Sequence, residues 1–464
     1  MIKALRENID RFLSPGALVI LSIAIVTSFI VASLPEKVVD GLPFWLTATA
    51  HRAAYVELVA EWNEEKPDKK IGMTQLHSRA LERRMLSGFL SGTPVADIIE
   101  AGIGVVAKVF LGPVNEIGFV DLTDLIHKEG IYQQINTPSF APYTSRGRIF
   151  GLPHDVHPVL LAYRSDIVEA AGIDVSTIET WDDYFRVMRP LFRDRNGDGQ
   201  PDHFLMTADD TRSDVAIMLI LQAGGSIFDQ NDKPDFASKR NAHVLATLTT
   251  WIAGPNATCT DVPANTAAGH RQRLEGFVIG TLVPDYMAGS WKIENPSLSG
   301  KLKFMPVPAW EKGGRRTTVA GGTMIGIPKA SKHFDTGWEF VKHLYLSPDL
   351  AKHMFENTSI ISPVKTTWTE SFYDEPDPFF SGQPIGRMYI EQAPHVPHRP
   401  SSPYTSAGGQ KIASSLIELA RYARANEIYD VASLEIEALN ILKANQASLE
   451  RLISRNLFLV KDEK

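Results

Sequence analysis

The stretch SRGRIFGLPHDVHPVLLAYR, residues 145–164, gives the clearest indication of the fold. Its Gly151-Leu152-Pro153 step predicts a break, because glycine and proline both favour turns over regular structure. The uncharged run Val159–Tyr163 that follows is rich in branched and aromatic side chains, which is typical of a buried strand. Two polar residues, His154 and Asp155, therefore stand between a break and a strand.

Strands and helices are predicted to alternate on both sides of this stretch. Amphipathic spacing predicts helices over 52–65, 78–91, 214–223, 240–253 and 335–346, and apolar β-forming runs predict strands over 43–49, 95–102 and 321–328. Thr180 is placed to cap a further helix. Such alternation is typical of an α/β fold with a mostly parallel sheet. We expect Pro348 to end a helix, residues 368–410 to be irregular, and 411–456 to form two helices that separate near Asn426.

Composition excludes several classes of protein. Of the 464 residues, 44% are hydrophobic and 22% are charged, which are globular values and exclude extensive disorder. Lys and Arg number 47 against 54 Asp and Glu, so the net charge of −7 argues against a nucleic-acid partner. The single cysteine, Cys259, excludes an intrachain disulfide and a cysteine-rich zinc site.

The N-terminus carries a pattern for export. Residues 16–34 contain no charge and follow Lys3, Arg6 and Arg11. A signal-peptide core spans about 7–15 residues, and a spanning helix needs about 18 or more. The length therefore favours an uncleaved anchor within 1–35, with a cleaved signal peptide as the alternative. Both an anchor and a signal peptide would place the remaining chain outside the cytoplasm. Because no cysteine directly follows the apolar run, a lipid anchor is excluded.

Several short motifs, in one order, resemble the family 1 extracellular solute-binding proteins of ABC importers, which include maltose- and oligosaccharide-binding proteins. The residues that carry the resemblance are Leu90–Asp97, Arg148–Pro153 with Leu161–Arg164, Ala171–Ile173 with Thr180–Asp183, Ala288–Trp291, Phe304–Pro308, and Gly321-Gly322 followed by Trp338–Phe340. Two departures are the spacing of Pro94 from Asp97 and Arg164 in place of the commoner asparagine.

This resemblance implies a two-lobed periplasmic-binding-protein-like α/β fold of type II that closes on a ligand by hinge motion. By that analogy lobe one comprises 41–156 plus 311–361, and lobe two comprises 157–310 plus 362–456. The expected partners are a small-molecule ligand and the permease of an ABC transporter. We expect a monomer that requires no cofactor and is tethered to the inner membrane by its N-terminal helix.

Candidate ligand-binding residues follow from where such a fold places its cleft, at loops beyond the carboxyl ends of strands. Sugars need flat apolar faces and polar groups for their hydroxyls. The candidates are His51, Arg52, Glu100, His154, Asp155, Tyr286, Trp291, Gly321, Gly322 and Trp368. The resemblance places Trp291 in a loop against the ligand, and the glycine pair could let backbone N–H groups approach it. Surface charge and tight turns are the alternative explanations.

A separate motif runs from residue 194 to residue 202. Its oxygen-bearing side chains, at alternate positions around a glycine, resemble a calcium loop and belong to Asp194, Asn196, Asp198, Gln200 and Asp202. The glutamate that completes such a loop is missing, because position 205 is leucine. A turn rich in Asp and Asn is the alternative to a structural Ca²⁺ site.

No motif of a metalloprotease, a nucleophilic serine hydrolase or a nucleotide-binding loop is found in the sequence. We therefore expect a non-enzymatic, extracytoplasmic protein that captures a sugar or oligosaccharide and delivers it to an ABC permease. The alternatives are a membrane-anchored ligand-sensing module of the same fold and a secreted glycan hydrolase.

Overall fold

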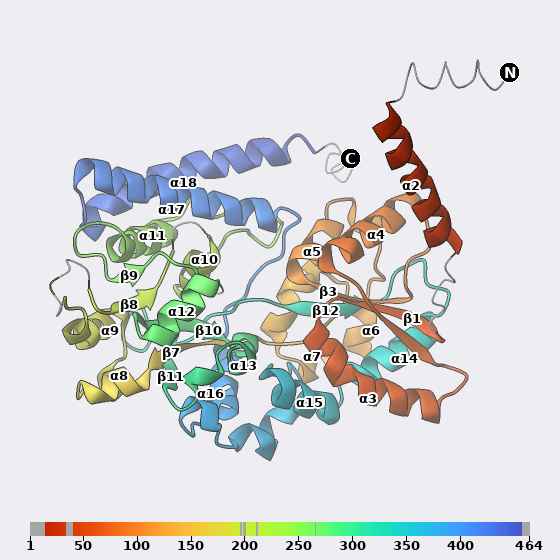
Figure 1. Cartoon of the computed structure of the whole chain (residues 1–464), viewed down its shortest axis with the longest axis horizontal. Helices are drawn as coiled ribbons and strands as arrows, with labels where there is room; N and C mark the ends of the chain where they lie inside the picture. Colours follow the sequence, from red (N-terminus) through yellow and green to blue (C-terminus); the bar gives the residue numbers. More distant parts are fainter. Residues whose placement is uncertain are drawn as a thin grey trace. The chain divides into compact units, whose positions relative to one another are not determined.

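The structure is a computed structural model, and it divides the chain into two units, Met1–Asp40 and Gly41–Lys464. The described residues are 14–33, 40–194, 197, 201–209, 212–264 and 266–456. In the first unit, helix α2 spans Pro15–Ser33 (Figure 1). Across the described ranges, no helix combines the length and apolar character needed to cross a membrane. The predicted membrane-spanning helix therefore finds no support within those ranges.

The second unit contains two five-stranded sheets, one in each lobe. The lobe-one sheet has the order β2-β1-β3-β12-β6, and its strands span Ile71–Gln75, Leu42–Leu46, Ile98–Gly102, Thr323–Gly326 and Leu152–Pro153. The lobe-two sheet has the order β11-β7-β10-β8-β9, and its strands span Leu302–Pro306, Val159–Arg164, Val278–Pro284, Phe204–Thr207 and Cys259–Thr260. A short hairpin joins β4, Thr144–Ser145, to β5, Arg148–Ile149.

Both sheets are mixed, so the expectation of mostly parallel sheets is wrong. β1 pairs in parallel with β2 and β3, whereas β12 lies antiparallel between β3 and β6. In lobe two, β8 pairs in parallel with β9 and β10, whereas β7 lies antiparallel to β10 and β11. In lobe one, the antiparallel strand β12 is the one that follows the second crossing, and it lies between β3 and β6.

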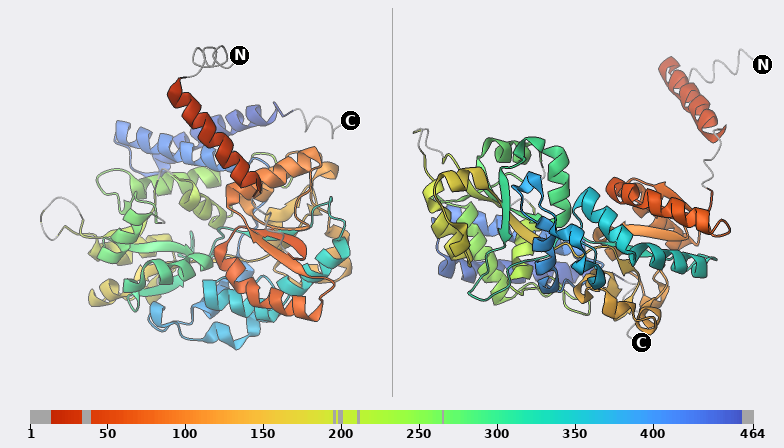
Figure 2. Two further views of the ribbon diagram at one scale, coloured as in Figure 1. Left: turned by 45° about the vertical axis from the view of Figure 1, so that its right-hand side comes forward. Right: turned by 90° about the horizontal axis from the view of Figure 1, so that it is seen from below.

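Helices cover the sheets of both lobes (Figures 1 and 2). Those of lobe one are α3 Thr49–Glu65, α4 Ser78–Ser91, α5 Ile103–Val109, α6 Thr123–Lys128, α7 Ile131–Gln134, α14 Phe334–Tyr345 and α15 Pro348–Thr358. Those of lobe two are α8 Ser165–Ala170, α9 Trp181–Met188, α10 Asp214–Gln222, α11 Lys239–Ile252, α12 Ala267–Glu275, α13 Asp285–Glu294, α16 Ile385–Gln392, α17 Thr405–Asn426 and α18 Val431–Ile453. Short 3-10 turns join them at Val114–Glu116, Thr137–Tyr143, Val175–Thr177, Arg189–Leu191, Pro296–Leu298, Lys365–Thr369, Ser371–Asp374, Pro378–Phe380 and Ala393–His395.

The helix pattern follows local sequence closely. Thr180 caps α9 in a reciprocal box with Asp183, as its N-cap chemistry predicts. Two expectations were incomplete. Pro348 follows one helix but also begins α15, because the first helical turn tolerates a residue without an N–H. The segment 368–410, predicted as irregular, contains α16 and the first turn of α17.

Three chain crossings join the lobes, and each carries a residue with left-handed backbone geometry. These are His157 (φ 53°) in the first crossing, Gly321 and Gly322 (φ 90° and 132°) in the second, and Ser359 (φ 61°) in the third. A side chain on Gly321 would collide with His157, which explains why glycine is needed there. Such element-terminal residues are where a hinge absorbs backbone rotation.

The second crossing lies later in the chain than predicted. Residues just before it bond to lobe two: Arg315 donates to the Leu221 carbonyl, and Thr318 donates to the Met218 carbonyl. Val319 forms a bridge with Pro158 at the start of the lobe-two sheet. The boundary therefore falls at 320–322 and not at 310–311.

Candidate functional site

A cavity of about 340 Å³ opens where lobe two faces lobe one, and we call it the cleft cavity. Its lobe-two wall includes Tyr286, from the first turn of α13, and Asp209, beyond the carboxyl end of β8. Ile103 contributes from lobe one, and Gly321 contributes from the second crossing. The cavity therefore combines apolar surface with hydrogen-bonding groups at the junction of the lobes.

A second cavity of about 430 Å³ lies on the lobe-one side and shares Ile103 with the cleft cavity. It is lined at the carboxyl ends of β1 and β3 by Thr47 and Gly102, and also by Gly322. The shared residue and the adjoining glycines place the two cavities next to each other. Together they offer space for a ligand that touches both lobes.

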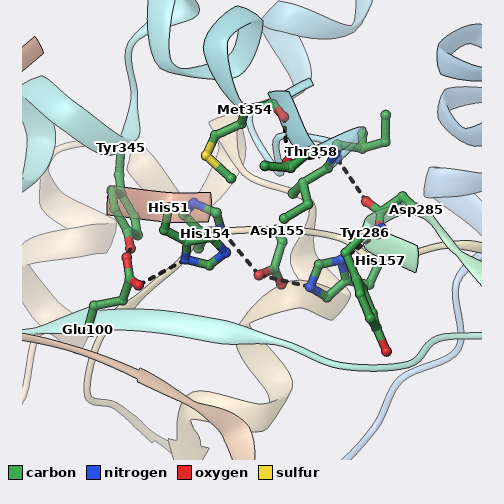
Figure 3. A network of polar contacts seen from close by, with 12 residues as sticks. His51, Glu100, His154, Asp155, His157, Asp285, Tyr286, Tyr345, Met354 and Thr358 are labelled. Carbon is green, nitrogen blue, oxygen red and sulfur yellow. Dashed lines mark hydrogen bonds and ion pairs between the residues drawn. The ribbon is translucent and has the colours of Figure 1, made fainter. Parts of the chain in front are cut away.

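Behind the cleft, a continuous set of buried polar side chains runs from lobe one through the first crossing into lobe two (Figure 3). We call it the hinge network; its members are His51, Glu100, His154, Asp155, His157 and Asp285, each at most 7% exposed. At the lobe-one end, His51 Nδ1 lies 2.9 Å from Glu100 Oε1. The hydroxyls of Tyr55 and Tyr345 donate to Glu100 Oε2 at 2.5 and 2.8 Å.

At the lobe-two end, His157 joins two carboxylates. Its Nε2 lies 3.0 Å from Asp155, and its Nδ1 lies 2.6 Å from Asp285. Asp285 also accepts the backbone N–H of Ile361, in the third crossing, at 2.8 Å. One buried carboxylate therefore ties two of the three crossings to the beginning of α13.

Asp155 and His157, neighbours in the hinge network, carry opposite charges. Although burial opposes a charged ring, the carboxylates of Asp155 and Asp285 raise the pKa of His157 to about 10. Burial also opposes the ionised form of Asp155, yet His157 and His154 hold its pKa well below the ordinary value. Burial and His51 together lower the pKa of His154. At neutral pH His157 is therefore protonated and Asp155 is ionised, beside a neutral His154.

The structure separates the predicted ligand-binding residues into three groups. Tyr286, Gly321 and Gly322 line the cavities described above, while His51, Glu100, His154 and Asp155 belong to the hinge network. The remaining three candidates line none of these cavities.

Those three are Arg52, Trp291 and Trp368. Arg52 is exposed on α3. Trp291 lies in α13 rather than in a loop, with a fully buried ring against the Arg273 guanidinium, which corrects the prediction of a ligand-facing aromatic. Trp368 is partly buried and donates from its indole to the Ser362 carbonyl at 2.8 Å.

Only part of the predicted calcium loop is described. Asn196, Asp198 and Gln200 lie outside the described residues. Asp194 accepts the backbone N–H of Gly197 at 2.6 Å, as in a turn built around an Asp side chain. The choice between a calcium site and a turn stays a prediction.

Arg399 is a cleft residue that sequence reasoning missed. It lines the cleft cavity, donates to the Gly321 carbonyl at 3.2 Å, and has a pKa lowered by burial. No ion pair to a carboxylate is found for it among the described residues. Its sequence context is a proline-rich segment without periodicity, so no local signal indicated that the fold brings it to the cleft.

Residues 48–349 match the family model of bacterial extracellular solute-binding proteins. The arabinooligosaccharide-binding protein of Bacillus subtilis is 29% identical over 307 residues, which cover 65% of this chain and 68% of that protein. The corresponding protein of Halalkalibacterium halodurans is 24% identical over 387 residues, which cover 81% and 83%. A lactose-binding protein of Rhizobium radiobacter is 23% identical, with 74% and 79% covered.

Solved structures share the fold at low sequence identity. A sugar-binding protein of Xanthomonas citri superimposes with a TM-score of 0.69 at 17% identity, covering 89% of this chain and 99% of its own. A protein of Bifidobacterium longum that binds galacto-N-biose and lacto-N-biose gives 0.66 at 16% identity, with 91% and 99% covered. Both proteins therefore share the two-lobed fold with this chain.

Proposed function

Because this chain belongs to the bacterial extracellular solute-binding proteins, we propose that it captures a sugar or oligosaccharide in the cleft and delivers it to an ABC permease. The relatives named for arabinooligosaccharides and lactose support the choice of ligand class. Short oligosaccharides containing arabinose or galactose are therefore the first ligands to test. The protein acts as a carrier and not as an enzyme.

The cleft cavity is the observation that carries this proposal. Its wall combines the ring of Tyr286, which can stack on the C–H face of a sugar, with charged groups that bond hydroxyls. Arg399 supplies donors to this space, and the mostly buried Asp209 contributes to its lining. This mixture of one flat apolar face and convergent polar groups is what a sugar requires.

Closure of the lobes is the proposed mechanism. The ligand contacts both lobes only when they are close, so it binds the closed state more tightly and shifts the population toward it. The left-handed residues in the three crossings provide the points of rotation. The closed form is then the one presented to the permease, with the protein acting as a monomer.

The family implies an extracytoplasmic location. We propose that the N-terminal 35 residues direct export, either as a cleaved signal or as a retained membrane segment. Fractionation of cells followed by N-terminal sequencing tests this. A mature chain that begins near residue 34 indicates cleavage, whereas an intact N-terminus in the membrane fraction indicates retention, and full-length protein in the cytoplasm contradicts export.

Isothermal titration calorimetry against arabino-oligosaccharides, lactose, maltose and the corresponding monosaccharides tests the function. We expect a dissociation constant in the micromolar range or below for at least one oligosaccharide, together with compaction in small-angle X-ray scattering. Absence of binding to the whole panel would contradict the sugar assignment. Release of a smaller sugar from any glycan by the purified protein would contradict the role as a carrier.

A further inference from the structure

The lobe-one end of the hinge network brings together three side chains that can ligate a metal. His51 comes from α3, Glu100 from β3 and His154 from the first crossing. One donor atom from each lies within 4.8 Å of the others, and all three residues are buried. Figure 3 shows the two imidazole rings next to Glu100; they are stacked, with centroids 4.2 Å apart.

His154 has an unsatisfied nitrogen in this cluster. Its Nδ1 lies 3.3 Å from an oxygen of the Asp155 side chain, which accepts a hydrogen bond, so the ring hydrogen belongs on Nδ1. Nε2 then carries a lone pair, and this atom is buried without a hydrogen-bond partner among the described residues. Burial of an unsatisfied polar atom costs about 1–3 kcal/mol, so this nitrogen requires a partner.

The surroundings also resemble the outer shell of a metal site. A metal-bound histidine commonly donates its other N–H to a carboxylate, as His154 does to Asp155. A ligating carboxylate is commonly held by hydrogen bonds, as Tyr55 and Tyr345 hold Glu100 through Oε2. Oε1 of Glu100 faces the ring of His51 instead and is the oxygen available to an ion between them.

We propose that His51, Glu100 and His154 form a binding site for a divalent transition-metal ion, with Zn²⁺ as the best fit. Two imidazoles and one carboxylate are a donor set that zinc accepts, with water in the fourth position. Ca²⁺ and Mg²⁺ prefer all-oxygen shells and fit this site poorly. The ion would replace the direct contact between His51 and Glu100 and would give His154 Nε2 its partner.

This site is distinct from the cleft and does not depend on the identity of the sugar. Its three ligands belong to a helix, a central strand and the first crossing, so a bound ion would cross-link lobe one to the base of the hinge. Zinc would therefore stabilise the fold whether or not a ligand occupies the cleft cavity.

The test uses the full, tag-free chain after removal of metal with EDTA. Zn²⁺ is titrated by calorimetry, zinc content is measured by mass spectrometry after dialysis, and thermal unfolding is followed with and without zinc. We expect one equivalent of tightly bound zinc, a raised Tm, and tetrahedral visible absorption when Co²⁺ replaces Zn²⁺. Substoichiometric zinc after dialysis, or Ca²⁺ and Mg²⁺ binding as tightly as Zn²⁺, would overturn the proposal.

Variants locate the ion. His154→Gln and Glu100→Gln should each weaken zinc binding at least 100-fold, with folding checked by circular dichroism. The matched control is His333→Asn, which removes an exposed histidine outside the cluster and should leave binding unchanged. If zinc binds the cluster variants as tightly as the unaltered chain, the site lies elsewhere. Should both variants fail to fold, the stoichiometry and Co²⁺ spectrum of the unaltered protein still decide the matter.

Discussion

The hinge network and the cleft cavity lie close together in the fold but use polar side chains in opposite ways. In the hinge network, Asp155, His157 and Asp285 are buried and bond to one another. In the cleft cavity, Tyr286 and Arg399 are only partly buried and face open space. The difference indicates that the network holds the crossings in place, while the cleft residues have polar atoms available for a ligand.

The largest effect is expected from Asp285→Ala. It removes one of the two carboxylates that bracket the protonated His157 and leaves the N–H of Ile361 without its acceptor. Breaking such a buried ion pair costs about 3–5 kcal/mol. Urea unfolding should show this loss, while the affinity of the folded fraction for sugar should change little. A fall in affinity with no change in stability would contradict the separation of the two regions.

Arg399→Ala should do the reverse of Asp285→Ala: it should weaken sugar binding and change stability little. Loss of a charge-assisted donor to a ligand costs about 1.5–3 kcal/mol, which corresponds to a roughly 10- to 150-fold larger dissociation constant. Stability should change by less than about 1 kcal/mol, because the hydrogen bond that is lost, to the Gly321 carbonyl, is a single one at 3.2 Å. Calorimetry and urea unfolding measure the two quantities. Arg52→Ala is the matched control, because Arg52 is exposed and lines neither cavity, and it should leave affinity unchanged.

Tyr286→Ala should weaken sugar binding about tenfold, or about 1.4 kcal/mol, through loss of a flat stacking surface. Tyr286→Phe keeps that surface and should retain most of the affinity. Calorimetry with the best ligand from the panel compares the two variants. If phenylalanine is as harmful as alanine, the hydroxyl and not the ring makes the main contact. If both variants bind normally, the ligand does not use this wall of the cleft cavity.

Local sequence predicted the architecture well, and the family resemblance is confirmed. The helix over 78–91 has those same bounds in the structure, and Thr180 caps α9, since amphipathic spacing and capping depend on neighbours in the chain. Sheet direction was mispredicted because β12 reaches its place only after the chain has crossed back to lobe one. Long-range topology of that kind leaves no periodic signal in the sequence.

The site was harder to predict than the fold. The Ala-Gly-Ser sequence before Trp291 suggested a loop, but Gly289 lies inside α13, where a Cβ would be 2.1 Å from the Thr358 carbonyl oxygen. The glycine therefore allows close packing, and Trp291 turns into the core. Conversely, Glu100 and His154 were predicted to bind the ligand, but both are buried in the hinge network and line neither cavity. Their mutual burial depends on tertiary contacts that a single sequence does not reveal.

The smallest effect is expected at a contact between the lobes that lies at a separate cavity of about 590 Å³, whose lining includes Arg146, Asp232 and His398. Asp232 belongs to lobe two and accepts from Ser145 of lobe one at 3.4 Å. Burial, aided by Asp229 and opposed by Arg146, raises its pKa to about 6. Because the folded pKa exceeds the ordinary value of 3.8, the folded chain binds the extra proton, so this stabilisation is present at low pH and is lost as pH rises through 6.

We therefore expect the Asp232 contribution to fall by about 1 kcal/mol between about pH 5.5 and about pH 7.5, and Asp232→Asn, whose amide stays neutral, to remove that part of the dependence. His398 lines the same cavity, and burial lowers its pKa, so its own contribution has the opposite sign. The comparison is accordingly made in a His398→Gln background by urea unfolding at a series of pH values. Stability that follows pH with the same slope in both proteins would contradict this prediction. Protonation of Asp232 would then contribute nothing to the free energy of unfolding, and this contact would differ from the hinge network, whose charged side chains bond to one another.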